Sequence, residues 1–567
     1  MLTYTPPDSR KPAKTYEKPW LLLLMVFAWL WPGVFSHDLW NPAEPVVFTA
    51  LEALRHGASP LVADVLGQAD FKIPPVYLWT AAAFQNLLSP WAADAYSAAR
   101  FASVFFTAAG LACCGFAGFN LLGRHHGRSV VLILAGCVGL LSMAHFLSGL
   151  SVTFAALSMI LCGFSLAHKK VITGALLLGG GWALLSLSAG FLLTAVLVLT
   201  ALLLPLHPQW RFKRYALTLV GAFAVGLPLM VVYPFLLHRL QPAAFDLWLN
   251  THSLGAFGGL ADFQTAFNLP YYLKNLIWFA FPAWPLMAWT YTRIRIGAQR
   301  WSVLGTAWIG AAAVLLAVNP ETYQDHLVWL LPPMALLGAA QLDGLRRDAA
   351  AFINWFGIMT FGFLAVFLWI GFFAMNYGWP AKLAERAAYF SPYYVPDIDP
   401  APMAVALLFT PLWLWAITRK NIRGRQAVTN WAAGVTLAWA LLMTLFLPWL
   451  DAAKSHAPVV RQMETALAPE LKQRFSDGLE CISVAAADHR ARIAWTQYGS
   501  LKLNVDDTAC RYRLVQQPKN TPPRKAGHKF GRAHGRGTRW KVSRYWKKRN
   551  KLSKITFRPS ENKFQTA

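Results

Sequence analysis

The chain has 567 residues, of which 56% are hydrophobic and only 14% are charged, and it contains 26 tryptophans. A soluble domain carries about 25% charged residues. Apolar runs of about 16 to 25 residues recur as far as residue 450, and no soluble core hides runs of this length. Composition therefore excludes a soluble protein and predicts a polytopic α-helical membrane protein.

The N-terminal arm, residues 1–19, precedes the first apolar block and predicts a retained first span at 20–35. No small-x-small cleavage site follows that block, which argues against a cleavable signal peptide. Lys/Arg clusters then punctuate the apolar blocks. They lie at 123–128, 168–170, 207–214, 293–300, 345–347 and 418–425.

The positive-inside rule places the arm and these six clusters in the cytoplasm. Thirteen spans satisfy this placement, with the N-terminus inside and everything after Leu450 outside. We expect them near 20–35, 101–122, 129–147, 152–167, 171–187, 189–206, 215–237, 271–291, 302–318, 327–342, 351–375, 401–417 and 430–449. One apolar run, 74–88, is short for a span and would invert every later loop if it crossed. It predicts a re-entrant or interfacial helix.

Residues 451–516 mix amphipathic helical and strand-like segments, which predicts a small α/β periplasmic domain after the transmembrane domain 20–450. Cys481 and Cys510 lie in this region. In an oxidising compartment they are a candidate disulfide pair, and otherwise they are two free thiols.

A basic tail, residues 517–567, ends the chain. Its last 49 residues hold 16 Lys/Arg and a single acid, so most of the formal net charge of +26 lies here. We expect this tail to be disordered and attracted to anionic membrane lipids. Nucleic acid is not an expected partner, because the topology places the tail outside. The alternative is an extension without a binding role.

The first outer loop, 36–100, carries the residues best suited to chemistry. It begins SHDLWNPAEP and places Asp38 and Glu44 just beyond the first span, with Lys72 further along. Carboxylates at headgroup level serve as a general base or bind a divalent cation, and a lysine binds a lipid phosphate. A structural alternative is that Asp38 caps the helix predicted from Pro42 onward.

The order of these motifs resembles the GT-C glycosyltransferases. Asp38 is followed by an Ala-Glu step, an amphipathic helix, an F-x-x-P-P-x-Y-x-W element and AARFASVFFTAAGLACCGFAGFNLLGR. Two later stretches, at 268–289 and 325–340, resemble the same proteins. The likeness covers roughly residues 15–510 and is greatest to the aminoarabinose-transferase-like and protein-mannosyltransferase-like group.

This resemblance implies that Asp38 activates the acceptor, alone or with a divalent cation as the one candidate cofactor, and that Glu44 is a second catalytic acid. It also implies a polyprenyl-phosphate-linked sugar as donor, a lipid or protein acceptor, and the bacterial inner membrane as location. Two departures stand out. The element that usually reads Phe-Glu-Lys-Pro-Pro has its lysine, Lys72, one place early. The second outer turn has Ser151 or a neighbour in place of an acid, so Glu321 or Asp325 is the candidate replacement.

Basic and histidine residues of other outer segments complete the candidates. Arg239, Lys274 and His252 are candidate phosphate ligands, and His37 and His326 are candidate proton carriers. The alternative for each is an ordinary hydrogen-bonding role at the membrane interface. The leading hypothesis is a membrane glycosyltransferase. The alternative is a divergent non-catalytic member that handles lipid carriers or assembles envelope complexes. A transporter is the weakest hypothesis, because the central spans lack paired charges.

Overall fold

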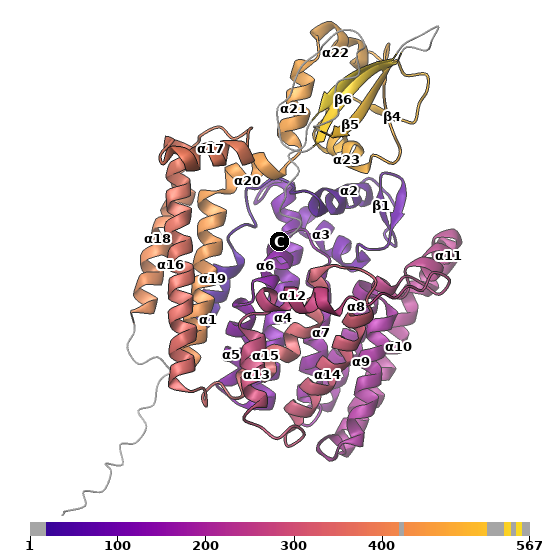
Figure 1. The fold of residues 1–567 in the computed structure, drawn as a ribbon. Coiled ribbons are helices and arrows are strands. Elements are labelled where there is room, and N and C mark those ends of the chain that lie inside the picture. The colour runs from indigo at the N-terminus through magenta and orange to yellow at the C-terminus, as the bar shows by residue number, and fades with distance from the viewer. Residues whose placement is uncertain (1–18, 419–423, 519–537, 546–551, 558–567) are drawn as a thin grey trace, which may run out of the picture.

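The computed structural model describes residues 19–418, 424–518, 538–545 and 552–557, and most of its elements are helices (Figure 1). Seven helices of this described part are long and apolar enough to cross a membrane. They are α4 (Ala95–Leu122), α8 (Val171–Ala189), α10 (Lys213–Leu240), α14 (Arg300–Val318), α16 (Arg347–Tyr377), α18 (Pro400–Ile417) and α19 (Gly424–Leu445). The prediction of a polytopic α-helical membrane protein is confirmed.

Shorter helices occupy the other predicted spans. They are α1 (Pro19–Leu30), α5 (His126–Ala135), α6 (Gly139–His145), α7 (Leu150–Leu166), α9 (Phe191–Leu203), α12 (Leu269–Phe279), α13 (Ala283–Tyr291) and α15 (Leu331–Ala340). Three 3-10 helices, η1 (Leu204–Leu206), η2 (Pro208–Trp210) and η4 (Gln324–Leu330), extend or join them. Each of the thirteen predicted segments therefore contains helix.

Two predicted spans are interrupted. The segment 129–147 consists of α5 and α6, bent by 83° at their junction. The Gly136 carbonyl at that bend accepts a hydrogen bond of 3.0 Å from the Trp431 indole of α19, so its acceptor is satisfied outside the helix. The segment 271–291 breaks between α12 and α13, where Pro282 has no N–H to continue the helix.

The first outer loop forms a layer across one end of the bundle (Figure 1). It contains α2 (Ala43–Arg55), the antiparallel strands β1 (Ala63–Val65) and β2 (Gln68–Asp70), and α3 (Pro75–Leu88). The helix α3 coincides with the predicted re-entrant or interfacial helix at 74–88. Further elements at this end are α11 (Pro242–Thr251), η3 (Gly255–Phe257), α17 (Ala381–Phe390) and α20 (Leu447–Lys454).

The basic turns meet at the opposite end. Lys169 Nζ lies 3.2 Å from Asn120 Oδ1 at the end of α4, and Arg214 donates to the His168 carbonyl at 3.1 Å. Arg300 Nε donates to the Gln209 carbonyl at 3.1 Å. The chain therefore separates its basic turns from the loops that carry the candidate site residues.

A C-terminal unit, residues 455–518, follows α20. Its helices are α21 (Ala457–Ala466), α22 (Pro469–Ser476) and α23 (His489–Tyr498), and its strands are β3 (Ile482–Val484), β4 (Leu503–Val505) and β5 (Tyr512–Pro518). β3 lies between β4 and β5 and is parallel to both, with Ile482 opposite Leu503 and Tyr512. The core of the unit includes Val460 and Trp495.

Two strands of the basic tail extend this sheet. They are β6 (Thr538–Tyr545) and β7 (Leu552–Phe557), and the sheet order is β4-β3-β5-β6-β7. The tail was expected to be disordered, whereas the structure has strands at these two segments. The rest of the tail, 519–537, 546–551 and 558–567, lies outside the described residues, as does the arm 1–18.

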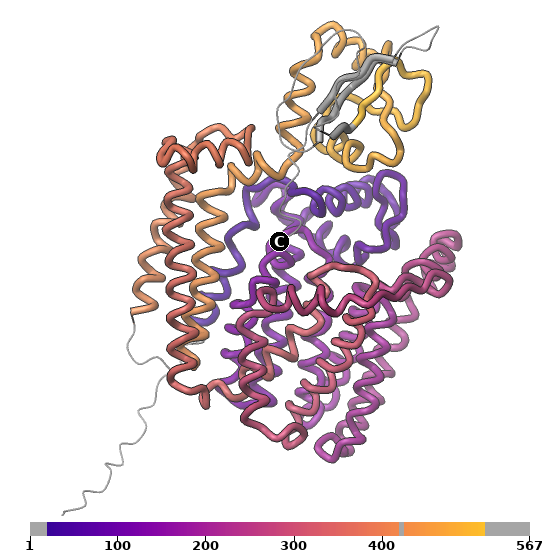
Figure 2. The backbone as a smooth tube through the Cα atoms, in the orientation of Figure 1, coloured from indigo at the N-terminus to yellow at the C-terminus, as the bar shows by residue number. Residues whose placement is uncertain are grey.

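The C-terminal unit packs against the first outer loop. Figure 2 shows the orange and yellow C-terminal unit above the indigo first loop. Ile493 of α23 is buried in one hydrophobic cluster with Phe48 and Leu51 of α2. The loop that carries Asp38 is consequently covered by residues more than 400 positions away in sequence.

Candidate active site

Asp38 lies in the irregular segment between α1 and α2, where it is half-buried. Its Oδ1 accepts hydrogen bonds from the Leu39 backbone N–H at 2.8 Å and from the Tyr498 hydroxyl. Its Oδ2 accepts from the Ser455 hydroxyl at 2.6 Å. The carboxylate that the sequence singled out is thus held by its own loop and by the C-terminal unit.

A second carboxylate, Asp451 of α20, supports the same loop. Its Oδ1 accepts from the Asp38 backbone N–H at 3.2 Å and from the Trp40 indole N–H at 2.7 Å. Burial, together with the nearby charge of Asp38, raises the pKa of Asp451 to about 7. Glu321 or Asp325 was the predicted replacement for the missing second acid, whereas the acid that the structure brings to Asp38 is Asp451.

Glu44 is buried beneath the first loop, where hydrogen bonds occupy its carboxylate. It is 2% exposed, and its carboxylate accepts four hydrogen bonds. The donors are Arg100 Nε at 2.8 Å, Arg100 Nη2 at 3.2 Å, Trp40 N at 2.9 Å and Leu147 N at 2.9 Å. A carboxylate offers about four lone-pair sites, so none remains for a reacting proton. The geometry favours a structural role for Glu44 over the predicted catalytic one.

The electrostatics of Glu44 agree with this role. Burial raises the pKa of the Glu44 carboxyl, but the neighbouring Arg100 guanidinium and His37 act in the opposite direction. The net result is a pKa below its usual value. Glu44 therefore stays ionised as the partner of a buried arginine.

Arg100 is the residue that organises this region. It is fully buried in α4, and besides Glu44 it donates to the His37 carbonyl at 2.9 Å and the Asp38 carbonyl at 2.8 Å. This arginine belongs to the AARFASV stretch of the sequence, for which no role was predicted. The sequence did contain an indication of its importance, because a lone cation in an apolar helix of this length needs a buried partner.

His37 adds a neutral ring beside Asp38. Its Nδ1 lies 2.8 Å from the Asp38 carbonyl, and its ring lies 4.7 Å from that of Trp40. Burial, and secondarily the charge of Arg100, lower the pKa of His37 to about 4. Its imidazole is therefore uncharged near neutral pH.

The second outer turn packs against the first loop without contributing an acid. The Ser148 backbone N–H donates to the Tyr77 hydroxyl at 3.2 Å. Ser151, at the position where an acid was expected, is buried, and its hydroxyl donates to the Ser148 carbonyl at 2.8 Å. The Ser151 side chain therefore forms a hydrogen bond within the turn, and the turn presents no carboxylate to a ligand.

Lys72 pairs with Glu321 of another outer turn. Its Nζ lies 2.8 Å from Glu321 Oε1, and the lysine side chain is 70% exposed. Its backbone N–H donates to Asp70 Oδ1 at 2.8 Å, which sets the chain direction after β2. Glu321 is thus the partner of the candidate phosphate ligand and is not assembled with Asp38.

Histidines surround this Lys72–Glu321 pair. His326 Nε2 lies 3.9 Å from Glu321 Oε2, and the Asn319 side chain lies 2.9 Å from His326 Nδ1. Burial lowers the pKa of His326 to about 4. His252 is close as well, with its ring 5.3 Å from that of Phe71. The positive charge of this cluster therefore comes from Lys72.

Arg239 and Lys274 are exposed residues of α10 and α12. Arg239 is exposed near the end of α10, with its guanidinium carbon 5.5 Å from the Phe235 ring centroid. Lys274 is exposed on α12, two residues after the buried Tyr272, whose hydroxyl donates to the Glu321 carbonyl. The helices of both residues reach the Lys72 region, because Tyr233 and Leu237 of α10 share a hydrophobic cluster with Phe71. Both assignments as phosphate ligands remain predictions.

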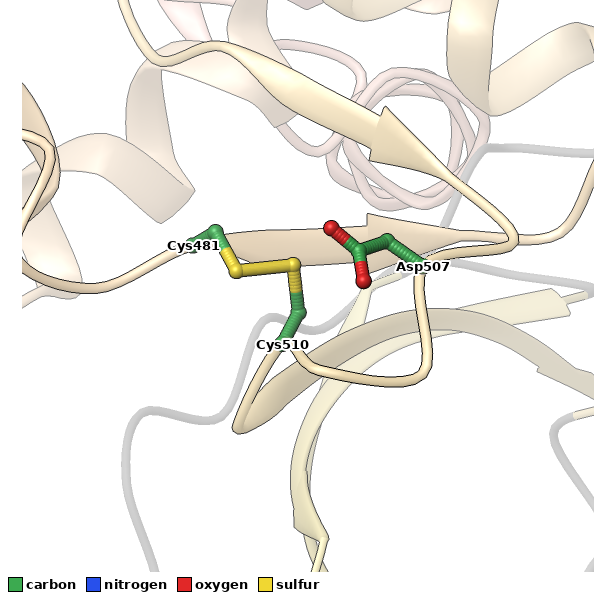
Figure 3. A group of neighbouring side chains, drawn as sticks. All are labelled: Cys481, Asp507 and Cys510. Carbon is green, nitrogen blue, oxygen red and sulfur yellow. A yellow bond between two sulfur atoms is a disulfide. The ribbon is translucent and has the colours of Figure 1, made fainter.

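Cys481 and Cys510 form a disulfide beside Asp507 in the C-terminal unit (Figure 3). The candidate pairing is therefore confirmed. The three side chains have metal-ligand spacing, but sulfur atoms bonded to one another supply no thiolates to a metal.

The described residues offer few free oxygen sites to a divalent cation at Asp38. Such ions take six or more oxygen ligands. Here both oxygens of Asp38 and Oδ1 of Asp451 already accept hydrogen bonds, and the second turn supplies a serine. We therefore derive no chemical step through a metal.

The fold is the one that the sequence resemblance predicts, since solved GT-C glycosyltransferases share it. The sequence itself matches no protein-family model and no curated protein significantly.

The fold is similar to that of ArnT from Cupriavidus metallidurans, an aminoarabinose transferase. For its apo structure the TM-score is 0.59 and the identity 16%, covering 87% of this chain and 86% of that chain. For the structure bound to undecaprenyl phosphate the values are 0.58 and 14%, covering 88% and 92%. The Archaeoglobus fulgidus oligosaccharyltransferase in its apo form has a TM-score of 0.41, at 10% identity, covering 86% and 64%.

Proposed function

We propose that this protein is a membrane glycosyltransferase that moves a sugar from a polyprenyl-phosphate carrier to an acceptor on the outer side of the membrane. The observation that carries the proposal is the Asp38 carboxylate, held at the outer end of the first helix by three hydrogen-bond donors. ArnT, which has a similar fold, was crystallised with undecaprenyl phosphate. The acceptor is a lipid A, an envelope glycan or a protein.

Asp38 acts as the general base in this mechanism. It takes the proton of the acceptor hydroxyl as that oxygen attacks the anomeric carbon, and the polyprenyl phosphate leaves from the opposite face. Displacement in one step inverts the configuration at this carbon. The acceptor oxygen gains the bond to the sugar, and the carrier departs as its phosphate.

Lys72 stabilises the departing phosphate. Positive charge placed where negative charge develops lowers the barrier of such a step. Lys72 faces Glu321 in an exposed pair, and exposed pairs contribute only about 0–1 kcal/mol. A phosphate with greater negative charge therefore replaces Glu321 as the partner of Lys72.

The topology that accompanies this function has thirteen spans in the bacterial inner membrane. The basic turns face the cytoplasm, and the first loop and the C-terminal unit face the periplasm. The Cys481–Cys510 disulfide supports this side, because disulfides persist in oxidising compartments. The basic tail then meets anionic lipid on the outer face.

One observation favours a second candidate, a non-catalytic protein that handles lipid carriers or assembles envelope complexes. The second outer turn has no acid, and Ser151 closes the turn on itself. In this alternative Lys72 retains a carrier phosphate while Asp38 only organises the loop.

The test uses a deletion strain of the parent organism complemented with the wild type, Asp38→Asn or Lys72→Ala. The masses of lipid A, envelope glycans and envelope proteins are compared among the strains. We expect the wild type to restore a sugar-sized mass increment and both variants to lose it. Lys169→Ala, at the opposite end of the bundle, is the control and should behave as the wild type.

Two results separate the candidate functions. If Asp38→Asn restores the increment fully, Asp38 is not the base and the proposed mechanism is wrong. If the deletion changes no mass but purified protein retains undecaprenyl phosphate in native mass spectrometry, and Lys72→Ala loses it, the non-catalytic alternative is supported.

A further inference from the structure

The C-terminal unit is fastened to the first outer loop at several points. The Arg492 guanidinium donates to the Leu66 carbonyl at 2.9 Å, and the Gln497 amide donates to the Thr49 hydroxyl at 3.1 Å. Ile493 lies between them in the helix and is 5% exposed. These contacts bring the end of α23 to the segment that carries Asp38.

Two hydroxyl groups of the unit reach the Asp38 carboxylate. Tyr498, the last residue of α23, donates to Oδ1. Ser455, between α20 and α21, donates to Oδ2 at 2.6 Å. The Ser455 oxygen also accepts the Ala457 backbone N–H at 2.9 Å, which orients its own proton toward Asp38. Both donors are therefore fixed by helix ends of the C-terminal segment.

The two donors differ in what they leave free on Asp38. A carboxylate oxygen has about two lone-pair sites. Oδ1 accepts from both Leu39 N and Tyr498, whereas Oδ2 accepts from Ser455 alone among the described residues. Oδ2 therefore has one site left for the proton of an acceptor hydroxyl.

The chemistry of Tyr498 suits a permanent donor. Burial, and then the charge of Asp38, raise the pKa of the Tyr498 phenol above its usual value. The phenol stays protonated and keeps its hydrogen bond to Oδ1. Asp451 adds a third constraint, because it binds the Asp38 backbone N–H from α20.

We propose that Ser455 and Tyr498 are positioning residues of the active site, which rotate the Asp38 carboxylate so that Oδ2 is the oxygen that takes the acceptor proton. The C-terminal unit then completes the catalytic site and is more than an appendage. This inference rests on the proposed function, since it concerns the orientation of the proposed base. Reactions of this kind lose about 100-fold in rate when a reacting group is misplaced by about 1 Å.

The test compares Tyr498→Phe, Ser455→Ala and the double variant with the wild type in the complemented deletion strain. The readout is the rate at which the sugar-sized mass increment appears after induction. We expect about 10- to 100-fold slower product formation for the double variant. Binding of undecaprenyl phosphate in native mass spectrometry should stay as in the wild type, because Lys72 and its partner Glu321 are unchanged. The melting temperature of each variant is measured alongside.

Matched controls separate positioning from general stability. Tyr393→Phe removes a hydroxyl that donates to Gln462 at 2.8 Å in the same region, and it should leave the rate unchanged. Ser455→Thr keeps the hydroxyl and should restore most of the rate. Asp38→Asn sets the fully inactive reference.

The outcomes are distinguishable. If Asp38→Asn is inactive while the double variant keeps the wild-type rate, the positioning role is wrong and the proposed function stands. If Asp38→Asn is active, the proposed function fails first. A loss in the double variant that is matched by Tyr393→Phe, or that follows a fall in melting temperature, also overturns the positioning role.

Discussion

At the scale of single residues, the Arg100–Glu44 pair decides where Asp38 stands. The pair is buried, and its atoms also hold the backbone of residues 37 and 38 and the N–H of Leu147. It therefore joins the first loop, α4 and the second outer turn. Asp38 owes its place at the end of the first span to these contacts.

Removing one partner of this pair should be costly. Arg100→Met leaves the Glu44 carboxylate buried and without its counter-charge, which typically costs about 3–5 kcal/mol. We expect a clear fall in the melting temperature of the purified protein in detergent, with loss of the sugar transfer proposed above. Differential scanning fluorimetry at neutral pH measures the first effect.

A suitable control is Arg425→Met at the other end of the bundle. Arg425 pairs with Asp343 in a pair that is partly exposed, and such pairs contribute about 0–1 kcal/mol. Its melting temperature should stay near that of the wild type. Equal effects of the two substitutions would show that burial of the Arg100 pair is unimportant.

At this scale the sequence indicated Asp38 and Lys72 as candidate site residues, because acids and lysines beside apolar runs are rare. It did not predict the partners. Ser455 and Tyr498 are ordinary residues in sequence, and only their distance to Asp38 gives them meaning. Glu44 was expected to react, but four donors occupy it.

At the scale of elements, the contact between the second outer turn and the start of α3 requires a glycine. A Cβ placed on Gly149 would lie 2.3 Å from Pro74 Cδ, well inside van der Waals contact. Pro74 precedes α3 and follows Lys72 by two residues. Close packing here therefore fixes the path of the chain after Lys72.

Gly149→Ala should disturb this packing. Overpacking of a tight contact costs about 1–3 kcal/mol, so we expect a lower melting temperature and slower sugar transfer. The displaced element carries Lys72, so binding of undecaprenyl phosphate in native mass spectrometry should weaken as well.

The control for this substitution is Gly310→Ala in α14, where an added Cβ meets nothing within 4 Å. Alanine in a helix interior is favoured over glycine by about 0.5–1 kcal/mol. The melting temperature should be unchanged or slightly higher. A Gly149→Ala protein as stable and active as this control would contradict the role of the contact.

Element types were largely predictable from the apolar runs and from proline positions, and α3 appears where the run at 74–88 indicated. The bend between α5 and α6 was not. At this bend the indole N–H of Trp431, 295 residues from Gly136 in sequence, donates a hydrogen bond to the Gly136 carbonyl. A local pattern contains no information on such a partner.

At the scale of the whole molecule, the two ends of the helix bundle differ in the loops that they carry. One carries the basic turns, and the other carries the first loop, the Lys72 cluster and the C-terminal unit (Figure 1). Positive-inside logic assigns the first end to the cytoplasm. Because each span crosses the membrane once, the side on which one loop lies fixes the side of every other loop.

Reporter fusions test this topology. A fusion at Arg124 should be active as a cytoplasmic reporter such as green fluorescent protein, and a fusion at Asp477 as a periplasmic reporter such as alkaline phosphatase. The reason is that eleven of the thirteen predicted spans, an odd number, lie between these two positions. A cytoplasmic signal at Asp477 would reverse the orientation and move Asp38 to the wrong side for a periplasmic acceptor.

The sequence alone determined the class of the protein, the two-sided arrangement of its loops and the loop that bears the candidate site. These follow from burial of apolar runs in lipid and from the cost of moving basic residues across it, and both act on local composition. Only the tertiary structure brought Asp451, Ser455 and Tyr498 to Asp38, enclosed Glu44 in four hydrogen bonds, and placed the last helices over the first loop. The contacts of Asp38 join residues some 410 to 460 positions apart in sequence. Tertiary packing brings such residues together, and no local sequence pattern indicates the pairing.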